Sequence, residues 1–192
     1  MSSDDTHKLI IITAPSGSGK TSVVNHLLQV HPQLIFSISA CTRNPRPGET
    51  DGLSYYFISV DDFKKKIEAD AFAEYEMVYE GKYYGTLKAE LDRIWNQQCY
   101  PLVDIDVKGA LKLKNQFGAN AMSIFLKAPS IAELENRLRK RGTETEASLK
   151  ERLDKAHFEL SFENQFDHIV VNDQLENACH KVSELTKAFL QF

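Results

Sequence analysis

Short apolar runs along the chain predict strands, and segments with apolar residues every three or four positions predict helices. Residues 8–13 form a continuous run rich in β-branched side chains, which is typical of a strand buried on both faces of a parallel sheet. A loop containing glycine and serine follows, and residues 20–30 then carry apolar side chains at helical spacing. Further strands are expected over residues 34–39, 55–58, 102–105, 122–126 and 168–171.

The other periodic segments predict helices and one hairpin. Ser59 has the residue type of a helix cap, and Asp62 three positions later completes the capping-box pattern. Residues 73–84 alternate around Gly81, which predicts a hairpin, and Pro129 precedes a later helix. Helices are expected over residues 60–69, 87–97, 108–117, 131–140, 147–162 and 175–189.

The order of these elements predicts the fold class. Strands alternate with helices at both ends of the chain, and a small β-rich stretch interrupts them after the second strand. This order predicts an α/β fold, with a parallel sheet flanked by helices and an inserted subdomain. The length of 192 residues suits one domain with small insertions, and 42% hydrophobic residues suffice for a core.

Charge and cysteine content narrow the class of protein. A formal net charge of -4 argues against general binding to nucleic acid or to an acidic membrane surface. The three cysteines, Cys41, Cys99 and Cys179, are widely spaced and form neither a disulfide framework nor a metal-ligand pattern. Residues 1–7 are short and polar, and no segment approaches the roughly 20 apolar residues of a membrane span. We therefore expect a cytoplasmic protein in a reducing compartment.

Residues 14–21 match the phosphate-binding loop pattern, except that Ala14 replaces the first glycine. Gly17 and Gly19 allow the backbone to curl so that its N–H groups point at phosphate oxygens. Lys20 is expected beside the β- and γ-phosphates, and the Thr21 hydroxyl beside Mg²⁺. The flanking strand and helix favour this interpretation over a plain turn. The predicted triphosphate-binding residues are Ala14, Pro15, Ser16, Gly17, Ser18, Gly19, Lys20 and Thr21.

A second candidate anion site lies in residues 42–49. Arg43 and Arg46 are three positions apart on a segment that two prolines stiffen. Two guanidinium groups on a rigid loop suit a phosphate monoester, which accepts paired hydrogen bonds from each. Ordinary surface arginines on a solvated turn are the alternative interpretation.

Several motifs together resemble one known family, the guanylate kinases. They occur in the order and at the spacings of that family, from about residue 9 to the end of the chain. The matching positions are residues 36–39, 42–43, 45–46, 48–49, Gly52, Tyr55, Phe57, 83–86, 104–106, Gly109, 141–145 and 171–173. The resemblance implies a P-loop NTPase-type sheet and Mg²⁺-dependent transfer of the ATP γ-phosphate to GMP, in purine nucleotide metabolism.

The resemblance also implies which residues bind GMP. Arg43, Arg46, Tyr55 and Tyr84 would hold its phosphate, and Ser39, Glu74, Thr86 and Asp106 would read its guanine.

The chemistry of guanine agrees with a carboxylate at Glu74. Guanine presents two adjacent donors, N1–H and the N2 amino group, and a carboxylate accepts both. A hydroxyl group from Ser39 or Thr86 can donate to guanine O6. The stretch from Glu74 to Tyr84 is one residue longer than the family pattern. We expect the turn near residues 80–82 to absorb the extra residue. Because of this extra residue, Glu76 stays an alternative to Glu74 as the carboxylate that reads guanine.

Two aspartates and three arginines complete the candidate site. Asp104 ends an apolar strand and is expected near Mg²⁺, in part through water; Asp106 is assigned to guanine, with a helix cap as the alternative. Arg137, Arg141 and Arg152 have the spacing of the lid that closes over the triphosphate in the family. Charged groups of this kind stabilise a transferring phosphoryl group. The predicted catalytic residues are Lys20, Arg43, Arg137, Arg141 and Arg152; Arg137 and Asn172 are also predicted to contact ATP, Asn172 at the adenine.

The resemblance divides the chain into three parts. A core covers about residues 8–34, 87–128 and 164–192, a GMP-binding α+β subdomain about 35–86, and a helical lid about 129–163. Two alternatives remain open: a kinase for another nucleoside monophosphate, and a non-catalytic guanylate-kinase-like binding module. The intact phosphate loop and the lid arginines argue against the module. ATP and GMP are the expected partners, and the sequence leaves the oligomeric state open.

Overall fold

The computed structural model describes residues 7–140 and 145–191. Its centre is a five-stranded sheet in the order β2-β7-β1-β8-β9, and every neighbouring pair in it is parallel. The strands are β1 (Leu9–Thr13), β2 (Leu34–Phe36), β7 (Tyr100–Asp104), β8 (Ala121–Lys127) and β9 (His168–Val171). The predicted α/β fold with a parallel sheet is confirmed.

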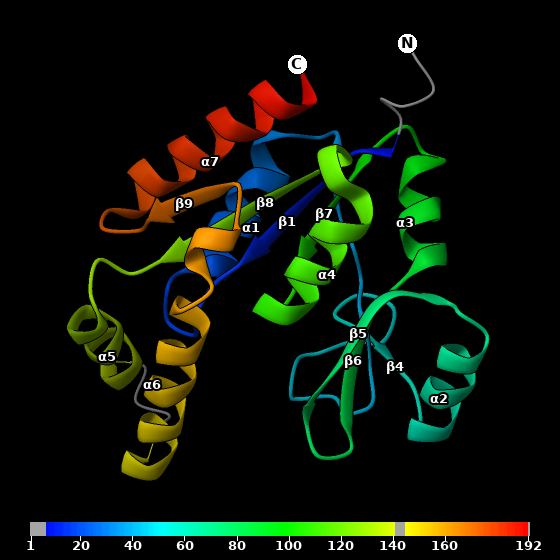
Figure 1. The fold of residues 1–192 in the computed structure, drawn as a ribbon, viewed down its shortest axis with the longest axis horizontal. Coiled ribbons are helices and arrows are strands. Elements are labelled where there is room, and N and C mark those ends of the chain that lie inside the picture. The colour runs from blue at the N-terminus through cyan, green and yellow to red at the C-terminus, as the bar shows by residue number, and fades with distance from the viewer. Residues whose placement is uncertain (1–6, 141–144, 192) are drawn as a thin grey trace.

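Helices cover both faces of this sheet (Figure 1). On one face, α1 (Lys20–Val30) and α7 (Leu175–Leu190) bury Val23, Leu27 and Val182 against the even-numbered isoleucines of β1. On the other face, α3 (Lys88–Trp95) and α4 (Val107–Phe117) pack against Leu9 and Ile11. All five residues of β1 are buried, as its unbroken apolar run predicts.

A second, four-stranded sheet in the order β4-β3-β6-β5 forms the inserted subdomain. Its elements are β3 (Ala40–Cys41), β4 (Tyr56–Phe57), α2 (Val60–Glu68), β5 (Phe72–Tyr79) and β6 (Lys82–Leu87). Phe63 of α2 stacks on Phe72 with ring centroids 4.3 Å apart, which gives the subdomain a small core of its own. Ser59 accepts a hydrogen bond from the Asp62 backbone N–H, so the expected cap is present.

The predicted lid segment contains two helices, α5 (Ile131–Lys140) and α6 (Glu146–Leu160). They pack through Leu134, Leu138 and Leu149, in a third apolar cluster. Thr145 and Ser148 cap α6 reciprocally. Most of the predicted polar break before α6 lies outside the described residues. Short 3₁₀ turns, η2 (Gly118–Asn120) and η3 (Glu163–Gln165), precede β8 and β9.

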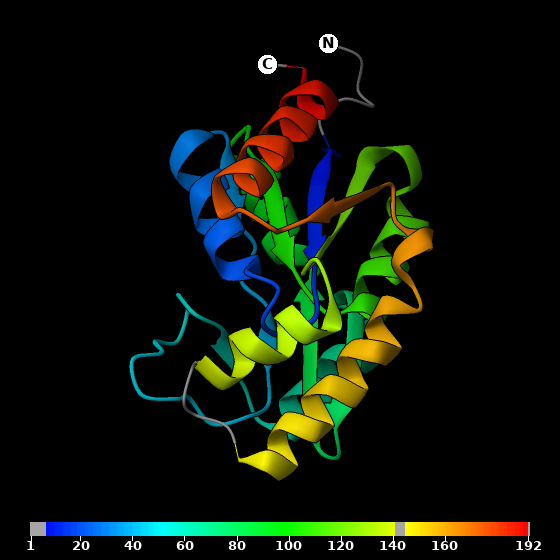
Figure 2. The same ribbon diagram turned by 90° about the vertical axis from the view of Figure 1, so that its left-hand side faces the viewer.

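The subdomain and the two lid helices lie beyond the same end of the central sheet, opposite the first residues of β1 and the last turn of α7 (Figures 1 and 2). The carboxyl ends of β1 and β7 meet there, with Ile12 in register with Asp104. Ligands of open parallel sheets bind at this edge, so the fold brings the loop after β1 and the predicted aspartates together. In the described part of the chain, no helix is long and apolar enough to cross a membrane.

Candidate active site

The loop between β1 and α1 has the backbone shape that phosphate binding requires. Gly17 and Gly19 have φ angles of 95° and 90°, in the left-handed region that favours glycine. A Cβ on Gly19 would lie 2.2 Å from the Asn172 side-chain nitrogen. A glycine-rich loop directly before α1 leaves the first amide hydrogens of the helix and the positive end of its dipole available to an anion.

Asn172 holds this loop from behind. Its side chain is buried, and Nδ2 donates a 2.8 Å hydrogen bond to the Ser18 carbonyl oxygen. That nitrogen is thus engaged with the loop itself, and the adenine contact predicted for Asn172 stays a prediction.

Lys20, the first residue of α1, forms an ion pair with Asp104 at the end of β7. Burial lowers the pKa of Lys20 to about 8, and the Glu159 and Asp106 carboxylates oppose that shift. A bound triphosphate would add negative charge beside Lys20 and favour its charged form.

A cavity of about 490 Å³ opens over the phosphate loop. We call it the donor cavity. Its lining comes from the phosphate loop and the start of α1, the loop that carries Arg46, the β7–α4 connection and α6. The lining residues are Ala14, Pro15, Ser16, Gly17, Gly19, Lys20, Thr21, Arg46, Ile105, Asp106, Ser148, Glu151, Arg152, Lys155 and Glu159. Arg152 reaches across it and donates a 2.7 Å hydrogen bond to the Ser16 hydroxyl group.

Of the other two predicted lid arginines, Arg137 is within the described residues. Arg137 donates to Glu133 at 2.8 Å and to the Asn172 carbonyl oxygen at 3.0 Å, so it joins α5 to the end of β9. It is not among the residues that line the donor cavity. Arg141 lies outside the described residues. The catalytic roles of all three stay predictions.

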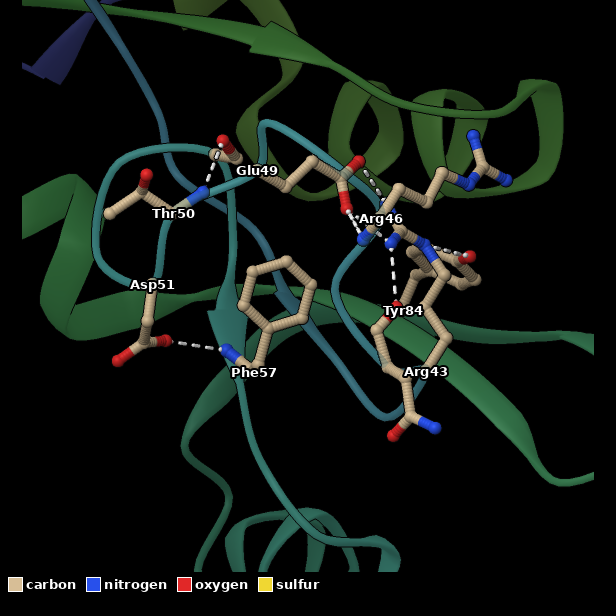
Figure 3. Close-up of polar contacts among 9 residues, drawn as sticks. Arg43, Arg46, Glu49, Thr50, Asp51, Phe57 and Tyr84 are labelled. Carbon is tan, nitrogen blue, oxygen red and sulfur yellow. Dashed lines mark hydrogen bonds and ion pairs between the residues drawn. The ribbon is translucent and has the colours of Figure 1, made fainter.

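Arg43 is held in a bidentate pair with Glu49 (Figure 3). Its two terminal nitrogens donate to the Glu49 oxygens at 2.5 and 2.7 Å, and Nε donates to the Tyr84 hydroxyl at 3.1 Å. The guanidinium also lies 4.9 Å from the Tyr55 ring centroid. Hydrogen bonds from the Arg43 side chain and the Arg46 backbone lower the pKa of Glu49 to about 2.

Arg46 extends away from that pair (Figure 3) and lines the donor cavity. Its backbone N–H donates to Glu49 at 2.8 Å, which fixes the start of the side chain. Within the described residues, its guanidinium makes no hydrogen bond. The two arginines of the loop therefore face different surroundings.

A second cavity, of about 180 Å³, lies between the central sheet and the subdomain. We call it the acceptor cavity. Most of the predicted GMP-binding residues meet in it, and its lining is Lys20, Ser39, Tyr55, Glu74, Val78, Tyr84, Asp104, Ile105 and Asp106. Lys20, Ile105 and Asp106 line both cavities, so the two are neighbours.

Glu74 is the buried carboxylate of the acceptor cavity. It is 5% exposed, and its Oε1 accepts from the Thr86 backbone N–H at 3.0 Å and the Thr86 hydroxyl at 2.7 Å. Burial raises the pKa of Glu74 to about 7, against the Thr86 hydroxyl that lowers it. A Cβ at Gly109 would lie 2.7 Å from Glu74 Oε2, so glycine there leaves room for the carboxylate.

Glu76 points elsewhere. It forms an ion pair with Lys112 at 2.6 Å and lines, with Met77, a third cavity that shares Val78 and Asp106 with the acceptor cavity. Of the two glutamates that the sequence left open, the structure therefore places Glu74, and not Glu76, in the acceptor cavity.

The β5–β6 hairpin has two irregularities of pairing, both within β5. The pairing register shifts between Phe72 and Glu74 and again between Met77 and Tyr79, while Tyr79 still pairs with Lys82 across a tight turn. The expectation that the turn near residues 80–82 absorbs the residue extra to the family pattern stays a prediction. A bulge re-aims the side chains beside it, and both shifts flank cavity-lining residues, Glu74 and Val78.

Two predicted guanine contacts have structural partners already. Asp106 caps α4, accepting from the backbone N–H groups of Lys108 and Gly109, and it also lines both cavities. Thr86 is fully buried and donates its hydroxyl to Glu74. Their contacts to guanine stay predictions.

The sequence interpretation missed several charged residues of the site, among them Glu49, Lys155 and Glu159. Glu49 was noted only as part of a motif, although its place three residues after Arg46 was a usable signal. Lys155 and Glu159 follow Arg152 at helical spacing and line the donor cavity with it. Burial raises the pKa of Glu159 to about 7, and Lys155 opposes that shift.

Comparison with known proteins agrees with this geometry. The family model described as guanylate kinase matches residues 6–189. The chain is similar to a guanylate kinase of Porphyromonas gingivalis, with 47% identity over 96% of this chain and 97% of that protein. It is 44% identical to one of Bacteroides thetaiotaomicron, over 96% of this chain and 91% of that protein.

A solved structure gives the same result. The crystal structure of guanylate kinase from Anaplasma phagocytophilum matches with a TM-score of 0.75 and 28% identity, over 94% of this chain and 85% of that chain. The chain belongs to the guanylate kinase family.

Proposed function

We propose that this chain transfers the γ-phosphate of ATP to GMP, producing ADP and GDP, and that the two neighbouring cavities hold the two nucleotides. The observation that carries this proposal is the shared lining: Lys20, Ile105 and Asp106 belong to both cavities. A triphosphate over the phosphate loop and a monophosphate beside Arg43 would thus meet at Lys20. Phosphoryl transfer depends mainly on such positioning and on neutralisation of charge.

Several charged side chains lie around Lys20, where the two cavities adjoin. Lys20 and Arg152 face the donor cavity from the loop and the lid, and Arg46 faces it from the subdomain. Tyr84 lines the acceptor cavity and accepts a hydrogen bond from Arg43, and the two would hold the acceptor phosphate. These cations would stabilise the charge on the transferring group, with no covalent enzyme intermediate required.

Glu74 carries the specificity for guanine. An ionised carboxylate accepts from both N1–H and the N2 amino group, whereas adenine has no such donor pair on that edge. A buried acceptor that the wrong base leaves unpaired is strongly unfavourable, so discrimination is large.

The residues also fit a Mg²⁺ ion bound with ATP. Thr21 and Asp104 offer hydroxyl and carboxylate oxygens on either side of Lys20, and Mg²⁺ prefers oxygen ligands. The described residues contain no group of three His, Cys, Asp or Glu side chains that could hold a metal. Phosphate and water oxygens would therefore complete the coordination. When bound, Mg²⁺ would neutralise charge on the phosphate oxygens.

A coupled assay of ADP formation tests the proposal. ATP and Mg²⁺ are supplied with GMP, AMP, UMP or dTMP in turn. We expect turnover with GMP, and its loss in Lys20→Met, because the variant removes the positive charge between the two cavities. Preference for another monophosphate would contradict the specificity, and absence of any turnover would favour the non-catalytic binding module.

A further inference from the structure

Glu90 in α3 is a buried carboxylate outside both cavities. Its side chain is 2% exposed. Arg93, one turn later, donates to it through two nitrogens, each at 2.8 Å. Two further donors come from distant parts of the chain: the Ile38 backbone N–H at 3.1 Å and the Tyr56 hydroxyl at 3.0 Å. One carboxylate therefore joins a core helix to two segments of the inserted subdomain.

The two distant donors are neighbours of acceptor-cavity residues. Ile38 precedes Ser39, and Tyr56 follows Tyr55; Ser39 and Tyr55 line that cavity. The Tyr56 backbone N–H also donates to the Ser39 carbonyl oxygen at 2.9 Å. Glu90 thus contacts both of the paired segments that carry Ser39 and Tyr55, one through Ile38 and the other through Tyr56.

Glu90 also lies where the chain passes between the two sheets. Residues 37–39 connect β2 of the central sheet to β3 of the subdomain sheet, and β6 passes directly into α3, three residues before Glu90. The hydrogen bond that Glu90 accepts from Ile38 therefore links the two segments, 37–39 and the β6–α3 junction, that pass between the sheets. Burial opposes ionisation, but the hydrogen bonds from Arg93, Ile38 and Tyr56 outweigh it and hold the pKa of Glu90 below its ordinary value.

We propose that Glu90 is a positioning residue for the acceptor nucleotide, which it serves by holding Ser39 and Tyr55 in place from behind the cavity. This inference rests on the proposed function, because it assigns the monophosphate to the acceptor cavity. The donor cavity shares none of the residues that Glu90 contacts. Loss of the Glu90 charge therefore affects GMP and leaves ATP bound as before.

The test is Glu90→Gln, which keeps the size of the side chain and removes its charge and one acceptor oxygen. We expect KM for GMP to rise about tenfold, equivalent to about 1.4 kcal/mol, with KM for ATP changed less than about twofold. Tyr56→Phe removes a single hydroxyl and should raise KM for GMP about threefold, so it tests the same contact if Glu90→Gln folds poorly.

Asp167 provides a matched control. It too accepts from a backbone N–H, a hydroxyl and a cation: Ser123 N at 2.8 Å, Ser123 Oγ at 2.8 Å and Lys114 Nζ at 2.8 Å. It lines neither cavity. Asp167→Asn should lower Tm as Glu90→Gln does, with no change in the ratio of the two KM values.

Equal changes in KM for GMP and ATP in Glu90→Gln would overturn the proposal. A rise in KM for GMP alone in Asp167→Asn would overturn it as well. If the wild-type protein forms no ADP with GMP, the proposed function fails. The dissociation constant for GMP, measured by calorimetry in the same variants, then decides the role of Glu90 independently.

Discussion

The pH dependence of GMP binding offers a direct test of the role of Glu74. The perturbation is a change of pH between 6 and 8, applied to the wild-type protein and to Glu74→Gln. Burial raises the pKa of Glu74 from 4.5 to about 7, so the Glu74 carboxyl group of the empty site is about half protonated at pH 7. A protonated carboxyl group has a donor where guanine presents a second donor. GMP must therefore bind the ionised form, and binding near pH 7 releases a proton.

The magnitude follows from that shift. A change from 4.5 to about 7 corresponds to about 3 kcal/mol for ionising Glu74 in the empty pocket. For a group with a pKa of about 7, the ionised fraction is about tenfold smaller at pH 6 than at pH 8, so GMP should bind about tenfold more weakly at pH 6. The same shift has a consequence for stability. The folded state holds more protons than the unfolded state between pH 4.5 and about 7, so this group makes the free energy of unfolding fall as pH rises through that window.

The assay is titration calorimetry of GMP in two buffers of different ionisation enthalpy, which counts the protons released. The GMP phosphate also titrates, with a second pKa near 6 for phosphate monoesters. Glu74→Gln retains that contribution, so the difference between wild type and variant isolates Glu74. Glu159 titrates in the same range, because burial raises its pKa to about 7, but it lines the donor cavity. Glu159→Gln should therefore leave proton release by GMP unchanged.

Two results would refute this reasoning. The first is proton uptake, or no proton exchange, when GMP binds to the wild-type protein at pH 7. The second is an identical pH profile in wild type and Glu74→Gln, since it would assign the whole dependence to the GMP phosphate. If Glu159→Gln alone removed the proton release, the titrating group would belong to the lid helix and not to the acceptor cavity.

Two further predictions concern the phosphate loop and the Arg43–Glu49 pair. Gly19→Ala should destabilise the protein by about 2–3 kcal/mol and weaken ATP binding, because its Cβ would displace Asn172 and a φ of 90° disfavours alanine. Gly81→Ala, with a φ of 69° but no atom within 4 Å, should lower Tm less in thermal unfolding, and equal losses would contradict the clash. Glu49→Gln should raise KM for GMP up to about tenfold, because Arg43 loses the contact that orients it. A lower KM would instead mean that Glu49 competes with the acceptor phosphate.

Local patterns predicted the elements of the central sheet and the lid well. Residues 131–140 and 168–171 were predicted with the bounds of α5 and β9, and residues 20–30 with those of α1. In each case the signal lies within the segment or next to it: helical spacing, a preceding proline or glycine, or a buried β-branched run. Such elements bury one apolar face, and that face is visible in the sequence.

The subdomain was predicted less completely because its pairing is not local. β3 has only two residues, Ala40 and Cys41, and it exists through pairing with β4 and β6, up to 45 positions away. Nothing in two residues signals a strand. The bulges in β5 have the same origin, because the register of β5 depends on β6 and on the cavity beside it.

The site was predictable to the extent that residue type alone determines chemistry. The glycines and Lys20 of the phosphate loop and the pair Arg43 and Arg46 follow from motif and spacing. The contacts that hold them, such as Asn172 to Ser18, join residues 154 positions apart. No local pattern reveals such a contact, and the predicted adenine role of Asn172 rested on resemblance for that reason.

Three glutamates show why the roles of individual carboxylates could not be predicted. Glu49, Glu74 and Glu90 are identical in chemistry, and the sequence has each within a few residues of an arginine, a tyrosine or an apolar segment. Their surroundings separate them. Glu49 meets Arg43 and has a pKa of about 2, Glu74 is buried beside a hydroxyl and has a pKa of about 7, and three donor groups keep Glu90 ionised despite burial. Burial and the number of donors are properties of the folded chain. The same side chain therefore orients an arginine at Glu49, lines a cavity at Glu74 and joins distant segments at Glu90, and the fold determines which.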